Sequence, residues 1–87
     1  RLRMLRRPID RFLPAQRRFT GGSHEMQAQA SDFRAVVGAV RARYPAFPES
    51  ELLGCSVAID GEIVNRPWLE PIGADSEVIF VARIGAG

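Results

Sequence analysis

The last residues of the chain carry the group with the clearest potential for chemistry. Behind the apolar run at residues 78–81 the sequence closes in Ile84-Gly85-Ala86-Gly87. Because glycine has no Cβ, its backbone can enter a narrow active site and adopt conformations closed to other residues. We therefore expect the Gly87 carboxylate to react in another protein's active site, on a slim tail. The alternative is an ordinary frayed chain end.

The rest of the chain offers little for catalysis. His24 is the only histidine and Cys55 the only cysteine, so neither a CxxC motif nor a Cys/His zinc cluster can be assembled. We expect His24 to be an exposed strand residue without a catalytic role, and Cys55 to be a small buried apolar residue. The prediction is a protein that is not an enzyme, with no catalytic residues, no metal and no bound cofactor.

Length and composition favour one small domain. The 87 residues, 46% hydrophobic and 25% charged, suffice for a single modest core. No apolar run approaches the roughly 18 residues that a membrane helix requires, and nothing resembles a secretory signal. We expect a cytoplasmic protein that does not associate with membranes.

Charge is distributed unevenly along the chain. Residues 1–18 hold seven arginines and one aspartate, about +6, while residues 19–87 hold five arginines and nine acids, about −4. Residues 1–7 are interpreted as a basic extension outside the fold. No aromatic stacking platform accompanies these arginines, so binding of nucleic acid is not expected.

Turn residues and alternation predict an opening hairpin. Residues 9–13 are typical of a strand that stops at Pro14, because proline cannot donate to a ladder. The pair Gly21-Gly22 allows positive φ angles, and residues 23–30 resume an alternating pattern. Two strands joined as a hairpin follow.

One helix of about three turns is expected next. Ser31 or Asp32 can cap it, and Phe33, Val36, Val37 and Val40 recur at the spacing of a single apolar face. Pro45 disfavours helical geometry at the residue before it and ends the helix. We expect the apolar face to pack on a sheet, with Leu52 and Leu53 closing the same core.

The C-terminal half predicts a second hairpin and a last strand. Residues 56–59 and 62–64 flank Asp60-Gly61, a strong signal for a two-residue turn. A Pro/Gly-punctuated connection then leads to a strand at residues 77–81. In that connection, Trp68 and Leu69 either mark a partner surface or pin the loop to the core. The element order gives an α+β fold with a mixed sheet of about five strands on one main helix.

In this order the elements resemble the β-grasp sulfur carriers, which include the molybdopterin-synthase small subunit and the thiamin-pathway carrier and have ubiquitin-like folds. Four segments, spread from Ile9 to Gly87, carry the resemblance. They are Leu13-Pro14 with Arg17-Arg18-Phe19-Thr20-Gly21-Gly22, Arg41-Ala42-Arg43-Tyr44-Pro45, Val57-Ala58-Ile59-Asp60-Gly61, and Asp75-Ser76-Glu77-Val78 with the tail. The resemblance implies a single β-grasp domain over residues 8–87, with residues 82–87 as its tail.

It also implies a function. Gly87 would be adenylated by a ubiquitin-activating-type adenylyltransferase that uses ATP, and a sulfur donor would convert it to a thiocarboxylate. The sulfur would pass to an acceptor synthase such as the molybdopterin-synthase large subunit, in molybdenum cofactor biosynthesis. Arg83, Ile79, Val81 and Ile84 are the candidate partner-binding residues, and strand parity leaves open which side chains point outward.

The tail departs from the family pattern at one position. Members typically close in Ala-Gly-Gly, whereas this chain has Gly85-Ala86-Gly87. If the penultimate residue must adopt positive φ, alanine there costs about 1 kcal/mol or more. Two alternatives therefore stay open: a β-grasp interaction module that is never activated, and a noncatalytic subunit of a two-protein enzyme. The sulfur pathway is also left open.

Overall fold

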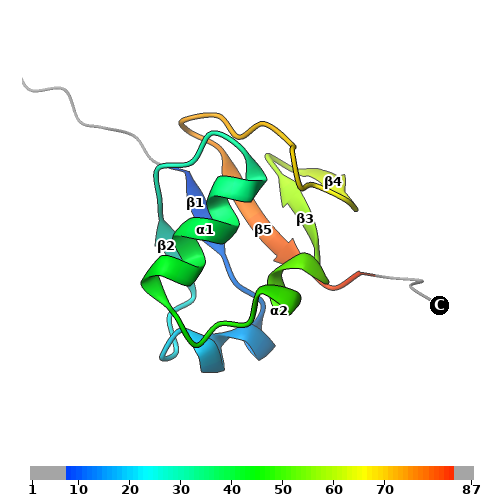
Figure 1. Ribbon diagram of the computed structural model, residues 1–87. Coiled ribbons are helices and arrows are strands. Elements are labelled where there is room, and N and C mark those ends of the chain that lie inside the picture. Colours follow the sequence, from blue (N-terminus) through cyan, green and yellow to red (C-terminus); the bar gives the residue numbers. More distant parts are fainter. Residues whose placement is uncertain (1–7, 84–87) are drawn as a thin grey trace, which may run out of the picture.

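The computed structural model describes residues 8–83, which form a five-stranded sheet with helices on one side (Figure 1). The predicted basic extension, residues 1–7, and the end of the predicted tail, residues 84–87, lie outside the described residues. In chain order the elements are β1 (Ile9–Arg11), the 3₁₀ helix η1 (Pro14–Phe19), β2 (Glu25–Gln27), α1 (Phe33–Arg43), α2 (Glu49–Leu53), β3 (Ser56–Ile59), β4 (Glu62–Val64) and β5 (Glu77–Val81).

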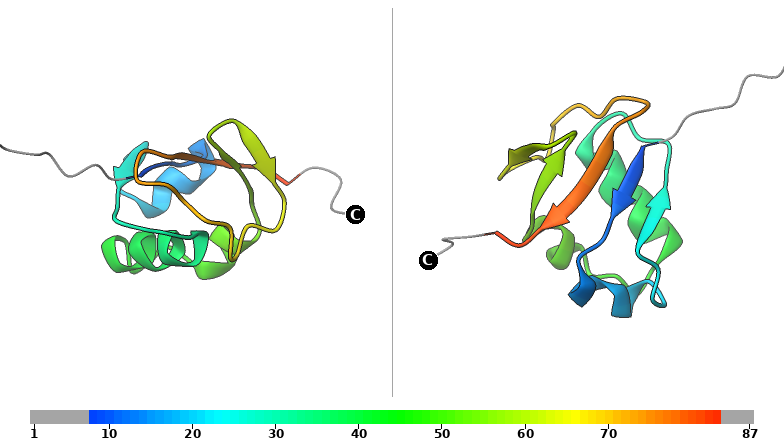
Figure 2. Two further views of the ribbon diagram at one scale, coloured as in Figure 1. Left: turned by 90° about the horizontal axis from the view of Figure 1, so that it is seen from above. Right: turned by 180° about the vertical axis from the view of Figure 1, so that it is seen from behind.

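The sheet is mixed, with strand order β2-β1-β5-β3-β4. β1 and β5 pair in parallel, and the other neighbouring strands pair antiparallel. β5 is therefore the central strand, with one hairpin on each side of the parallel contact. The view from above in Figure 2 shows α1 and α2 on the same side of the sheet, and among the described residues no helix covers the other face. The predicted α+β class with a five-stranded mixed sheet is confirmed.

Helix α1 forms as its sequence predicts. The Asp32 side chain caps it by accepting a hydrogen bond from the Ala35 amide at 2.8 Å, which satisfies one of the unpaired amides of the first turn. Its four buried residues are the expected apolar face: Phe33, Val36, Val37 and Val40. The helix ends at Arg43, two residues before Pro45.

Aromatic rings fill the space between α1 and the sheet. Phe12 stacks on Phe80 with ring centroids 6.0 Å apart, and Phe80 also contacts Phe33 at 5.9 Å. Phe47, from the loop after α1, lies 5.8 Å from Phe12 and is fully buried. Large buried rings supply much of the apolar area that stabilises so small a domain.

The opening hairpin is less regular than the sequence predicts. β1 ends at Arg11, and η1 intervenes before the turn at Gly21 and Gly22, whose φ angles are 65° and 91°. Proline is well suited to the first position of η1, since its missing amide is not needed there. Gln16 is buried within η1, where its Oε1 accepts a hydrogen bond from the Leu13 amide at 2.9 Å.

The expectation that Leu52 and Leu53 both close the core is wrong for Leu53. The two residues lie in α2, a short helix that the sequence analysis does not predict. Neighbouring residues on a helix point about 100° apart, as 3.6 residues per turn require, and in α2 this turn carries Leu53 to the edge of the core. Leu52 is fully buried, whereas Leu53 remains 40% exposed.

The second hairpin and the last strand are confirmed. Asp60 and Gly61 have φ angles of 51° and 87°, the left-handed pair that a tight turn of this kind requires. β5 spans Glu77–Val81 as expected, with Val78 and Phe80 buried on the helix side. No helix in residues 8–83 is long and apolar enough to cross a lipid bilayer.

Candidate functional site

The open face of the sheet carries the two predicted partner-binding residues of the last strand. Val78 and Phe80 point toward the helices, so the alternate residues Ile79 and Val81 lie on the side that no helix covers. Both are half-buried. Strand parity, which the sequence leaves open, is thus decided by the packing of Val78 and Phe80 under α1.

Register brings further apolar residues next to Ile79. Ala58 of β3 lies directly across from Ile79, and Ile63 of β4 lies directly across from Ala58. Ile63 is 58% exposed, a high fraction for an isoleucine. We call Ala58, Ile63, Ile79 and Val81 the open-face patch. Sequence reasoning missed Ala58 and Ile63, because their place beside Ile79 depends on the pairing of three strands.

The other half of the open face is charged. Arg11 of β1, the register partner of Ile79, forms ion pairs with Glu25 of β2 (2.7 Å) and with Glu77 of β5. These side chains are exposed enough that each pair contributes little stability. Their effect is to place a polar border beside the open-face patch, as is usual at the rim of a protein interface.

Arg83 holds the base of the tail. Its Nη2 donates to the carbonyl oxygen of Asn65 at 2.8 Å, and lies 3.4 and 3.3 Å from those of Leu53 and Cys55. One guanidinium thereby joins the end of α2, the start of β3 and the loop after β4 to the last described residue. The sequence predicts a partner-binding role for Arg83; in this structure its Nη2 contacts the protein's own backbone.

The other predicted site residues belong to the end of the tail. Ile84, Gly85, Ala86 and Gly87 lie outside the described residues. The roles expected of them, including the reactive carboxylate of Gly87, remain predictions. These four residues follow Arg83, two residues after the end of the central strand β5.

The start of β5 is held by a network that sequence reasoning missed. The Asp60 carboxylate accepts hydrogen bonds from the Ser76 hydroxyl at 2.8 Å and from the Glu77 amide at 2.9 Å. The Glu77 amide bond is the main reason that the pKa of Asp60 is lowered, and the Ser76 bond adds to it. Asp60-Gly61 is evident as a turn in the sequence. The contact between the Asp60 side chain and Ser76 is not evident, because the two residues are sixteen positions apart.

The loop that carries Trp68 is attached through its backbone. The Trp68 carbonyl accepts from the Arg34 amide and the Glu70 carbonyl accepts from the Phe33 amide, both at 3.0 Å, so the loop closes over the first turn of α1. The side chains of Trp68 and Leu69 nevertheless remain exposed. The backbone of this loop is therefore attached to the fold, whereas the side chains of Trp68 and Leu69 remain available to a partner.

His24 is exposed and Cys55 is buried, as predicted, but His24 does not belong to a strand. His24 is exposed, just before β2. Cys55 is buried; its Sγ is within hydrogen-bonding distance of Gln16 Nε2 and of the Glu51 carbonyl oxygen, 3.2 Å in each case. Burial raises the pKa of the Cys55 thiol, and the nearby Glu51 charge raises it further. Within residues 8–83, no cluster of three His, Cys, Asp or Glu residues could hold a metal ion.

Comparison with known proteins does not assign this site. No protein-family model matches the chain, and no curated protein matches it. The site is therefore defined by its own geometry: an apolar patch on the uncovered face of the sheet, a charged border, and a tail base held by Arg83 at the end of the central strand.

Proposed function

We propose that this chain is a sulfur carrier with a β-grasp fold, whose C-terminal Gly87 is activated and converted to a thiocarboxylate. The topology supports the fold: β1, which forms a hairpin with β2, pairs in parallel with β5, the hairpin of β3 and β4 lies on the other side of β5, and one main helix crosses a single face. The place of the tail in the chain supports the function, since the tail follows β5, the central strand of the sheet.

The chemistry requires other proteins. A carboxylate resists nucleophilic attack, so a ubiquitin-activating-type adenylyltransferase first joins Gly87 to AMP and releases pyrophosphate from ATP. The terminal sulfur of a persulfide then attacks the acyl carbon and displaces AMP. A thiol cleaves the resulting acyl disulfide, which leaves the thiocarboxylate on the carrier. The carrier contributes the acyl group and a docking surface, and no acid or base.

The contacts of Arg83 are the observation that best supports the proposal. A terminus that reacts inside another protein must leave its own domain in a defined direction, since orientation of the reacting group lowers the barrier. The three carbonyl contacts of Arg83 hold the last described residue against the domain. The open-face patch ends on the same strand, through Val81, and provides apolar area for the partner's docking.

The proposed partners are the activating enzyme, a sulfur donor and an acceptor synthase such as the large subunit of molybdopterin synthase. We propose that it acts in the cytoplasm, in molybdenum cofactor biosynthesis. The carrier itself binds no cofactor in this scheme, since ATP is held by the activating enzyme.

Pyrophosphate exchange tests the first step. The chain is incubated with an adenylyltransferase of this class, ATP and labelled pyrophosphate, and carrier-dependent label in ATP is the expected result. Deletion of Gly87 removes the reacting carboxylate from its position and should abolish exchange. Intact mass after addition of a sulfur donor should rise by about 16 daltons, the difference between sulfur and oxygen in the acyl product.

Ala86 supports the competing proposal of an interaction module that is never activated. The two proposals separate in one comparison: Ala86→Gly restores the glycine that the family typically has. If the chain is a carrier slowed by the methyl group, exchange is measurable and rises in this variant. If neither the chain nor the variant supports exchange with any enzyme of the class, the carrier proposal fails.

A further inference from the structure

A second surface lies on the helix side of the domain, around Trp68. Two hollows share this residue. One, of about 460 Å³, follows the exposed side of α1 and is lined in part by Arg34, Gly38 and Arg41. The other, of about 290 Å³, includes Arg66 and Arg83. The first is as large as the hollows that hold small ligands or the side chains of a bound peptide. We call these six residues the Trp68 surface.

The charges of the two hollows are almost all of one sign. Four arginines line them, against Glu49 as the only acid. Within the described part of the chain, Arg34 and Arg66 take part in no side-chain hydrogen bond or ion pair. Arg41 donates to the Phe47 carbonyl, and Arg83 to the carbonyls named above; these acceptors are uncharged and leave the positive charge uncompensated.

Gly38 forms part of the floor of the larger hollow, and the fold does not require a glycine there. It lies in the middle of α1, where glycine is less favourable than alanine. A Cβ at this position would meet nothing within 4 Å, so no neighbouring element needs the space. The missing side chain deepens the hollow between Arg34 and Arg41, next to the exposed ring of Trp68.

We propose that the Trp68 surface binds an acidic segment of a partner protein, with carboxylates on Arg34 and Arg66 and an apolar side chain against Trp68. Arginine binds carboxylates with two parallel hydrogen bonds, and tryptophan and arginine are favoured in the centres of interfaces. The floor of the larger hollow is aliphatic, with Trp68 as the only aromatic lining residue, which favours a peptide over a strand of stacked bases. This surface does not include the open-face patch.

Trp68 is the only tryptophan of the chain and reports on binding directly. The probe is a short synthetic peptide in which glutamates flank two central leucines, titrated into the full chain while tryptophan emission is recorded. We expect a saturable blue shift that weakens as salt is raised, because salt screens exposed charges. A peptide with lysines in place of the glutamates should give no shift.

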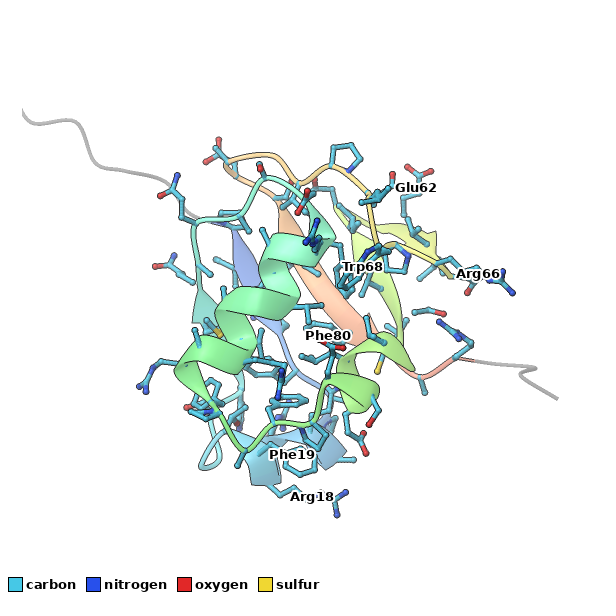
Figure 3. The ribbon with its side chains drawn as sticks, in the orientation of Figure 1. Arg18, Phe19, Glu62, Arg66, Trp68 and Phe80 are labelled. Atoms are coloured by element: carbon cyan, nitrogen blue, oxygen red, sulfur yellow. The ribbon has the colours of Figure 1, made fainter. Side chains whose placement is uncertain are left out.

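Two variants locate the interaction. Arg34→Glu combined with Arg66→Glu should weaken binding about tenfold or more, since one exposed ion pair contributes up to a factor of about five. Gly38→Gln should also weaken it, because the side chain fills the hollow without changing charge and suits a helix. Arg18→Glu is the matched control: Figure 3 shows Arg18 at the lower end of the domain, away from Trp68 and Arg66.

Each result decides the proposal. It is overturned if the acidic peptide leaves the emission of Trp68 unchanged, if Arg18→Glu weakens binding as much as the double variant, or if single-stranded DNA binds more tightly than the peptide. Circular dichroism of each variant confirms that the domain is folded before titration. Because pyrophosphate exchange is not part of this experiment, failure of the Trp68 proposal and failure of the carrier proposal are seen separately.

Discussion

Asp10 of β1 lies directly across from Val78 of β5, and both residues are fully buried on the helix side of the sheet. On the other side of β1, the register partner of Asp10 is Met26. Neither neighbour can donate a hydrogen bond through its side chain, and neither oxygen of the Asp10 carboxylate has a partner in the described part of the chain. Burial raises the pKa of Asp10 to about 7.

The domain should therefore become more stable as the pH falls from 7 toward 4. The folded state keeps Asp10 protonated up to about pH 7, whereas the unfolded chain loses this proton near the ordinary value of 3.8. The folded state binds the extra proton between these values, so the free energy of unfolding decreases as pH rises, by about 4 kcal/mol in total. Urea unfolding followed by circular dichroism across this range measures the slope.

The variant Asp10→Val separates this contribution from those of other carboxyl groups. Valine matches the neighbouring Val78 and removes the buried charge, so we expect higher stability at pH 7 and little difference at pH 4. A variant whose advantage is the same at both pH values would show that Asp10 is ionised or neutral throughout the range, contrary to its burial without partners.

The contribution of the Asp60 carboxylate to the free energy of unfolding should depend on pH in the opposite sense to that of Asp10. Its lowered pKa means that its bonds to Glu77 and Ser76 are present above pH 3.8 and are lost as the pH falls through the folded-state pKa. Asp60→Ala should lower the melting temperature at pH 7 and have less effect at pH 2. Asp60→Asn is the control, because asparagine tolerates the positive φ and retains one acceptor oxygen.

Two glycines should respond oppositely to alanine. Gly38 lies in a helix with free space at its Cβ position, so Gly38→Ala should stabilise the domain by about 1 kcal/mol. Gly61 has a φ of 87°, so Gly61→Ala should destabilise it by at least about 1 kcal/mol, through backbone strain. Chemical denaturation of both variants beside the parent chain makes the comparison. Equal changes of the same sign would contradict it.

The open-face patch should be needed for activation. Ile63→Arg places a charge on the most exposed residue of this patch, and we expect the rate of pyrophosphate exchange at low carrier concentration to fall about tenfold or more, the effect of losing an important apolar contact. Ile63 is already 58% exposed, so the melting temperature should change little. Leu69→Arg is the matched control, an exposed leucine outside the sheet. Loss of exchange in both variants would argue against a specific role of the patch.

The main helix, the second hairpin and the last strand were predictable because they depend on neighbours in the chain, whereas β1 and β2 are shorter than their patterns predicted. Spacing along α1 predicted its buried face, and Pro45 its end. Asp60-Gly61 predicted the second hairpin, because only residues that tolerate positive φ can form that turn. The short helix α2 was not predicted, since its five residues carry no periodic pattern long enough to recognise, and Leu53 was consequently misplaced.

The amino-acid sequence alone thus determined the fold class, the main helix, the second hairpin and the last strand, all of which follow from local periodicity and turn chemistry. Only the tertiary structure decided which side of β5 faces outward, that Ala58 and Ile63 lie beside Ile79, and that Arg83 contacts the carbonyls of Leu53, Cys55 and Asn65. These relations join residues far apart in the chain. They depend on strand register and on packing against α1, which no local pattern encodes.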